Sequence, residues 1–174
     1  MTRTRLEDAV MEALLNGDHP LLVALQRQWR SMIVVDRTFT GVGVYTTFST
    51  NGAADPVSGL PDRLILGDVH ATISGLESGA GFVLYVIHGM IDTLEAYTYG
   101  ESWPESVEEF QLSYASPDRS SVLSTLNAAA QSPDAGLRPA IVGEAPVPAP
   151  KIPGGHDRGA DPVATLLAPL TRPD

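Results

Sequence analysis

Hydrophobic residues near the N-terminus recur at helical spacing. Leu6, Val10 and Leu14 lie four residues apart, which places them on one face of a helix. Thr4 and Glu7 fit a capping box, in which a hydroxyl and a carboxylate bind backbone N–H groups that lack a partner in the first helical turn. The pattern predicts an amphipathic helix that begins next to Thr4.

A second helix is predicted after a clear interruption. Asn16-Gly17 is typical of a helix end, and Asp18-His19-Pro20 supplies a capping residue and an early proline. Four apolar residues of this helix are predicted to face the core: Leu21, Leu22, Leu25 and Trp29. Arg27 and Arg30 are predicted to face outward.

The period changes to two from Met32. Residues 33–35 predict a short strand, and residues 39–49 predict a longer one. One face of the longer strand is formed by Val42, Val44, Thr46 and Phe48. Gly41 and Gly43 inside a strand usually mark a bulge or a close approach of two backbones.

Residues 68–74 alternate between apolar and polar side chains. Val69, Ala71 and Ile73 are predicted to point inward. Four polar residues are predicted to point outward: Asp68, His70, Thr72 and Ser74. The alternation indicates a sheet with one buried face and one face nearer to water.

The middle of the chain predicts a hairpin of two long strands. Residues 82–87 are apolar at every position, which is typical of a central strand covered on both sides or partly covered by the C-terminal segment. His88-Gly89 predicts a tight turn, because glycine adopts the positive φ that such turns require. The returning strand, residues 90–99, is expected to contain a bulge, because its apolar residues slip to a spacing of three: Ile91, Leu94 and Tyr97. Residues 110–114 are predicted to form an edge strand.

The composition changes after Pro117. Asp118 is predicted to cap a short helix through Val122, Leu123 and Leu126, whereas the last 42 residues hold nine prolines and five glycines, which favour extended chain. We therefore predict one α+β domain over residues 1–131, with two N-terminal helices packed on a mainly antiparallel sheet of five to six strands. Residues 132–174 are predicted to be a Pro/Gly-rich tail that is extended or weakly ordered, with a docking turn at residues 163–167.

Composition excludes several classes of protein. The chain has no cysteine, so disulfides, thiolate metal sites and a cysteine nucleophile are excluded. The longest apolar run, residues 82–87, is far short of the roughly 20 residues that a membrane helix needs. The N-terminus turns acidic where a signal peptide would turn apolar. We expect a cytoplasmic protein that uses no cofactor and does not act at a membrane.

Charge is unevenly distributed along the chain. The formal net charge is −10, and nine acidic residues but no lysine or arginine lie between Arg63 and Arg119. A field of one sign attracts basic surfaces and repels phosphate polyanions, so nucleic-acid binding is not expected. A basic protein surface is the predicted partner. The alternative is a solvated acidic rim that only keeps the domain soluble.

The acidic residues are densest in a segment that also carries aromatic side chains. The candidate partner-binding residues are Asp92, Glu95, Tyr97, Tyr99, Glu101, Trp103 and Glu105. Tyrosine and tryptophan supply contact area at low entropic cost, and Pro104 stiffens the loop in which it lies. In the alternative interpretation, Tyr97 and Trp103 are core residues.

No catalytic or metal-binding motif is complete in this sequence. Residues 41–43 lack the third glycine of a dinucleotide-binding loop and are flanked by strands. Asp68 and His70 would need a serine in three-dimensional reach to form a catalytic relay. We predict no catalytic and no metal-binding residue. The alternative function is a small-molecule-binding or hydrolytic domain on the polar sheet face around Tyr45, His70 and Thr72.

Three stretches resemble a group of small bacterial proteins, some of which neutralise toxins as immunity proteins. They are residues 37–43 (RTFTGVG), residues 79–86 (GAGFVLYV) and residues 94–104, with LEAYTY followed by WP. In size and composition the chain is also similar to the mycobacterial immunity factor of the tuberculosis necrotizing toxin, an NAD glycohydrolase. The resemblance implies a non-enzymatic antitoxin that inhibits a cognate bacterial toxin by covering its active site. It implies no functional motif at the level of single residues.

Overall fold

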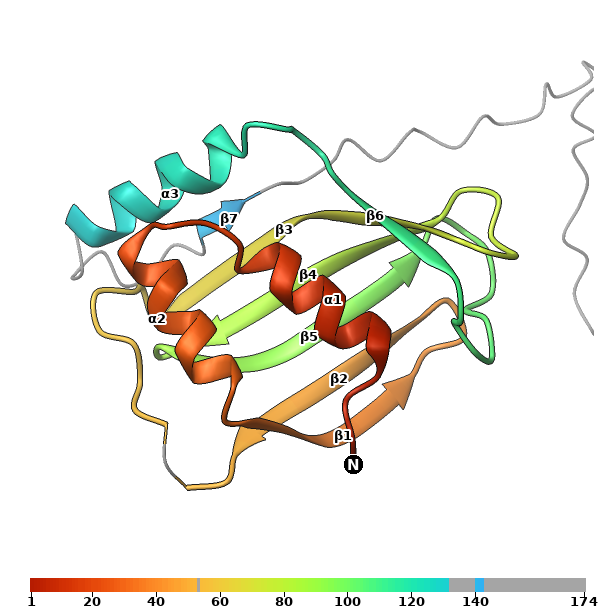
Figure 1. Ribbon diagram of the computed structural model, residues 1–174, viewed down its shortest axis with the longest axis horizontal. Helices are drawn as coiled ribbons and strands as arrows, with labels where there is room; N and C mark the ends of the chain where they lie inside the picture. The colour runs from red at the N-terminus through yellow and green to blue at the C-terminus, as the bar shows by residue number, and fades with distance from the viewer. Residues whose placement is uncertain (53, 132–139, 143–174) are drawn as a thin grey trace, which may run out of the picture.

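Two helices lie across one face of an antiparallel sheet in the computed structural model, which describes residues 1–52, 54–131 and 140–142 (Figure 1). The helices are α1 (Arg5–Leu14), α2 (Pro20–Trp29) and α3 (Ser120–Gln131). The strands are β1 (Met32–Phe39), β2 (Gly43–Thr50), β3 (Arg63–Ile73), β4 (Ala80–Ile87), β5 (Met90–Thr98), β6 (Phe110–Tyr114) and β7 (Ala140–Val142). The first six strands are antiparallel in the order β1-β2-β5-β4-β3-β6, and β7 lies parallel to β3. The α+β class predicted from the sequence is confirmed.

Capping determines where α1 and α2 begin. Thr4 Oγ1 accepts from the Glu7 N–H at 3.1 Å, and Glu7 Oε2 accepts from the Thr4 N–H at 2.6 Å, which is the predicted capping box. His19 Nδ1 accepts from the Leu21 N–H, and Pro20 occupies the first position of α2. The predicted apolar stripes of both helices are buried.

The core fills the space between α1, α2 and the face of the sheet that they cover, which we call the inner face. The opposite face is the outer face. Large inner-face residues of the central strands include Leu64, Leu66, Ile73, Phe82, Leu84, Ile91 and Leu94, all of them buried. Each contributes roughly 1.5–3 kcal/mol when it is removed from water. The described residues place no helix over the outer face (Figure 1).

Two strand predictions differ from the structure around the first turn. Residue 39 belongs to β1, so the turn to β2 falls at residues 40–42, where Gly41 has a φ of 90°. The bulge lies in β1 itself, between Val34 and Asp36. Gly43 is a close approach, as predicted, because a Cβ there would lie 2.2 Å from the Ala96 carbonyl oxygen.

Two predictions about the central strands concern which side chains are covered. Two-sided cover of β4 is absent among the described residues, since Val83, Tyr85 and Ile87 are only half-buried on the outer face. The alternative, partial cover by the C-terminal segment, lies outside the described residues. Asp68 was expected to point outward. A register shift in β3 between Leu66 and Val69 changes the alternation, and the Asp68 side chain is buried.

The β4–β5 hairpin follows the prediction closely. His88 and Gly89 both have positive φ, 47° and 75°, as a tight turn requires. The predicted bulge is present in β5, where Tyr85 pairs with Thr93 but Val86 pairs with Ile91. Because the bulge restores a period of two, the last inward-facing apolar residue is Ala96 instead of Tyr97.

The C-terminal part is described only in pieces. Val122 and Leu126 of α3 are buried, whereas Leu123 is exposed. Residues 140–142 of the predicted tail form β7 beside β3. The rest of that tail, including the predicted turn at residues 163–167, lies outside the described residues. In the described part, no helix combines the length and hydropathy needed to cross a membrane.

A buried glutamine joins α2 to the β4–β5 hairpin. Gln28 Nε2 donates to the carbonyl oxygens of Asp55 and Gly89, both at 3.0 Å, and its Oε1 accepts from the Ile91 N–H at 2.7 Å. We expect Gln28→Leu to lower the free energy of unfolding by roughly 2–3 kcal/mol, because buried backbone groups lose their partners. Urea denaturation measures the loss, with Gln111→Leu on the exposed side of β6 as the control. Equal losses in the two variants would contradict this role.

Candidate functional site

The outer face carries four tyrosines, which we call the tyrosine cluster: Tyr45, Tyr85, Tyr97 and Tyr99. They come from β2, β4, β5 and the residue that follows β5. The strand register sets Glu95 opposite Tyr45, and Tyr97 opposite Gly81. Side chains that are distant in the sequence therefore meet on one surface.

Glu95 is held between two members of the cluster. Tyr45 Oη donates to Glu95 Oε1 at 2.9 Å, and Tyr85 Oη donates to Oε2 at 2.8 Å. Burial and the hydrogen bond to Glu95 raise the pKa of Tyr85 to about 12, so the phenol remains a donor at neutral pH. The Arg63 guanidinium lies over the Tyr85 ring, 5.2 Å from its centroid.

The other two tyrosines pack on each other and on β4. A Cβ at Gly81 would lie 2.5 Å from Tyr97 Oη, so glycine is needed for the Tyr97 ring to lie against the β4 backbone. The Tyr99 ring meets the Tyr97 ring edge-on at 5.6 Å. Tyr99 Oη lies 2.7 Å from His70 Nδ1. Burial lowers the pKa of His70 despite the opposing attraction of Asp68, which favours a neutral imidazole, and the tautomer of that ring decides whether Nδ1 or the Tyr99 hydroxyl is the donor.

The structure divides the seven predicted partner-binding residues among four places. Glu95, Tyr97 and Tyr99 lie on the outer face. They share it with Tyr45 and His70, which belonged to the alternative prediction of a small-molecule or hydrolytic site. The two hypotheses therefore refer to the same surface.

Asp92 and Glu101 bind neighbouring parts of the chain. The Asp92 carboxylate, at the β5 bulge, accepts from Thr93 Oγ1 at 2.8 Å. The Glu101 carboxylate accepts from the backbone N–H groups of Glu77 and Ser78 at 2.9 and 3.0 Å. These bonds lower the pKa of Glu101. Glu101 thus holds the β3–β4 loop in place, as well as adding negative charge.

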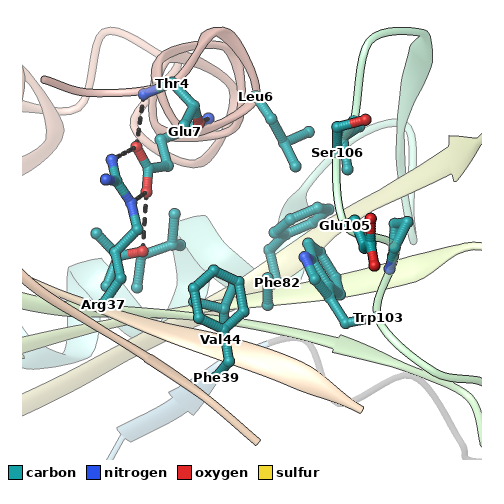
Figure 2. Close-up of a pocket in the computed structure, with 15 residues that line it drawn as sticks. Thr4, Leu6, Glu7, Arg37, Phe39, Val44, Phe82, Trp103, Glu105 and Ser106 are labelled. Carbon is teal, nitrogen blue, oxygen red and sulfur yellow. Dashed lines mark hydrogen bonds and ion pairs between the residues drawn. The ribbon is translucent and has the colours of Figure 1, made fainter. Parts of the chain in front are cut away.

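Trp103 and Glu105 lie at a pocket on the inner side of the sheet (Figure 2). The backbone N–H of Trp103 donates to the Gly41 carbonyl oxygen at 2.8 Å, and the half-buried Trp103 ring packs against the core. Glu105 is exposed. Trp103 was considered either as a core residue or as a partner-binding residue. Its ring touches the core and also borders solvent, so its position is compatible with both.

An ion pair between α1 and β1 was not predicted. Arg37 Nε and Nη2 donate to the two oxygens of Glu7, both at 2.7 Å, and Thr46 Oγ1 donates to Oε1 at 2.8 Å (Figure 2). Burial alone would raise the pKa of Glu7, but hydrogen bonds from Arg37, Thr4 and Thr46 lower it below 4.5. The sequence signal was limited to the capping box, which does not reveal a partner thirty positions away.

These groups are arranged for binding more than for proton transfer. Asp68 pairs with Arg119 at 2.5 Å and makes no hydrogen bond to His70, so the Asp–His relay considered from the sequence is not assembled. The Glu7 carboxylate is already bound by four donors. Among the described residues, no three His, Asp or Glu side chains converge as metal ligands.

No family model, curated protein or solved structure matches the chain. Its function must therefore be argued from the surfaces that its own side chains build.

Proposed function

We propose that this chain is a non-enzymatic protein-binding module that docks a basic surface of its partner on the outer face. The observation that carries the proposal is the tyrosine cluster around Glu95, on a sheet face that no described helix covers. The concrete form of the proposal is an immunity protein that inhibits a cognate bacterial toxin. This form is supported by the resemblance of residues 37–43, 79–86 and 94–104 to small bacterial proteins, some of which neutralise toxins. The similarity in size and composition to the mycobacterial immunity factor points to an NAD glycohydrolase as the target.

The cluster is ordered before any partner arrives. Each tyrosine is fixed by a hydrogen bond, a ring contact or both, through Glu95, Gly81 and His70. Side chains that are already fixed lose little conformational entropy on binding, so more of their contact energy contributes to affinity. Tyrosine also suits an interface because its ring is apolar and its hydroxyl is polar.

This face carries both apolar area and negative charge. Ile33 and Val35 of β1 are 43% and 46% exposed, and Tyr45 is 38% exposed. Glu95 supplies a carboxylate in the middle of the cluster. Exposed apolar area of this kind often marks a protein-binding site, and the local excess of acids favours a basic partner.

The alternative of a hydrolytic site around His70 has less support. His70 has a tyrosine hydroxyl as its partner at Nδ1, and the nearest acid in the sequence, Asp68, is neutralised by Arg119. A general base needs an orienting group and a nucleophile within hydrogen-bond reach. Tyr99 can orient the ring of His70, but the described contacts of His70 include no serine or threonine nucleophile and no carboxylate.

The test begins with capture of partners from the native host on the full chain, followed by kinetics with the purified candidate. Tyr45→Ala should speed dissociation about thirty-fold, which corresponds to a hot spot of roughly 2 kcal/mol. Glu95→Gln should slow association and weaken its salt dependence, because the carboxylate steers a basic surface. Surface plasmon resonance at several salt concentrations separates the two effects.

Glu12→Gln is the matched control, since Glu12 is exposed on α1, on the opposite side of the sheet. It should leave both rates unchanged. A melting temperature for each variant without partner excludes loss of the fold as the cause. If Tyr45→Ala and Glu95→Gln both bind like the unaltered chain, the outer face is not the docking site. If the captured partner is a toxin whose activity persists at equimolar protein, the immunity form of the proposal fails.

A further inference from the structure

A pocket of about 330 Å³ opens on the inner side of the sheet, away from the tyrosine cluster (Figure 2). Its walls are the first turn of α1, the inner faces of β1, β2, β4 and β5, and the loop of residues 103–107. It lies where the capped end of α1 stops short of covering the sheet. Ligand pockets in proteins are commonly about 300–1,000 Å³ in volume, and this one is at the small end of that range.

The lining is mainly apolar and includes three aromatic rings. Phe82 forms the floor, and Phe39 and Trp103 lie nearer the mouth (Figure 2). Phe39 is 64% exposed, although its side chain is a large apolar ring. An exposed aromatic residue beside an apolar hollow gains by being covered. Aromatic walls also favour a flat partner, because rings interact edge-on or in offset stacks.

The polar groups at one end of the pocket already have hydrogen-bond partners within the protein. Glu7 is bound by four donors, and its charge is balanced by Arg37. Among the described residues, no buried side-chain nitrogen or oxygen lacks a hydrogen-bond partner. The pocket therefore requires no charged group from its ligand, since burying an unpaired charge would cost several kcal/mol.

Charge at the mouth acts against anions. Glu105 is exposed there, and the lining has no cation other than the paired Arg37. A ligand with a negative group would approach a protein of formal net charge −10 past this carboxylate. The volume of the pocket limits the size of the ligand. An engineered cavity of ~150 Å³ holds one benzene ring, and this pocket has about twice that volume.

We infer that this pocket binds an uncharged aromatic small molecule of two or three rings. This is a second site, separate from the proposed partner surface, because the two lie on opposite faces of the sheet. The inference goes beyond the proposed function and does not depend on it.

Two fluorescent dyes with the same ring skeleton test the ligand class. N-phenyl-1-naphthylamine is uncharged, and 8-anilinonaphthalene-1-sulfonate is its sulfonate. The uncharged dye should bind the folded full chain at one site, and at least about ten-fold more tightly than the sulfonate. Glu105→Gln should reduce the difference in affinity between the two dyes, because it removes the carboxylate that repels the sulfonate at the mouth. Backbone NMR shifts on binding the uncharged dye should centre on Val44 and Trp103.

A pocket-filling variant and a matched variant of the outer face complete the test. Val44→Phe should weaken binding of the uncharged dye at least about ten-fold, because the added ring occupies the cavity. Ala96→Leu, on β5, serves if Val44→Phe does not fold. Tyr45→Ala, the adjacent residue on the outer face, should not change dye binding. Equal affinity for the two dyes, unsaturable binding, or unchanged binding in a folded pocket-filling variant would overturn the inference.

Discussion

Replacing Arg119 with methionine is expected to lower the free energy of unfolding by about 3–5 kcal/mol. Its buried guanidinium pairs with Asp68, through Nε at 2.5 Å and Nη2 at 3.0 Å. It also donates to the carbonyl oxygens of Asn16 at 2.6 Å and Leu14 at 2.9 Å. Methionine keeps much of the packing on the Tyr114 ring, but it leaves the Asp68 carboxylate buried without a counter-charge.

Equilibrium unfolding in urea measures the loss, and Arg30→Met at the exposed end of α2 is the control. That control should change stability by less than about 0.5 kcal/mol, as surface substitutions usually do. The double variant Asp68→Leu/Arg119→Met should recover a large part of the loss, because it removes both buried charges. A loss below about 1 kcal/mol for Arg119→Met would mean that the pair does not hold α1, β3 and α3 together.

The helices could be predicted because their signals are local. Thr4 and Glu7 lie within one turn, and the burial of Leu6, Val10 and Leu14 follows from their spacing alone. The same holds for the tight turn at residues 88–89, where glycine is required by the backbone. No knowledge of distant parts of the chain was needed for these elements.

Strand faces were harder to predict because a bulge changes the alternation without a distinct sequence signal. The shift beside Asp68 reverses its expected direction, and the true partner, Arg119, lies 51 positions away. The strand of residues 82–87 is apolar on both faces, although the helices of the described residues cover only one. Its outer residues Val83, Tyr85 and Ile87 are only half-buried, and the Tyr85 hydroxyl binds Glu95 on this face.

The predicted site was divided for the same physical reason. A contiguous acidic and aromatic segment was considered as one surface, but alternate strand residues point to opposite faces. Glu95 and Tyr97 therefore point outward, whereas Trp103 lies after the strand has ended and returns to the inner side. Tyr45 and Tyr85 joined the surface only through strand pairing, which the sequence could suggest but not specify.

Glu7 is the second residue whose loss should strongly destabilise the fold. Glu7→Ala is expected to lower the free energy of unfolding by about 3–4 kcal/mol, because Arg37 and the buried Thr46 hydroxyl lose their partner and the capping box is broken. Thermal or urea unfolding measures the loss. Glu12→Ala, on the exposed side of the same helix, should cost far less.

The contribution of Glu7 should also depend on pH in a defined direction. Its pKa is lowered below 4.5 in the folded protein, so unfolding favours proton uptake by this group. The stabilisation is therefore complete above the unfolded pKa and is lost as the pH falls through the folded one. Glu7→Gln keeps the shape but cannot ionise, so its stability deficit relative to the unaltered chain should be largest at pH 7 and should shrink below about pH 4.5. Urea unfolding at pH 7 and pH 3.5 measures both deficits, with Glu12→Gln as the control. An equal deficit at the two pH values would show that Glu7 acts through packing alone.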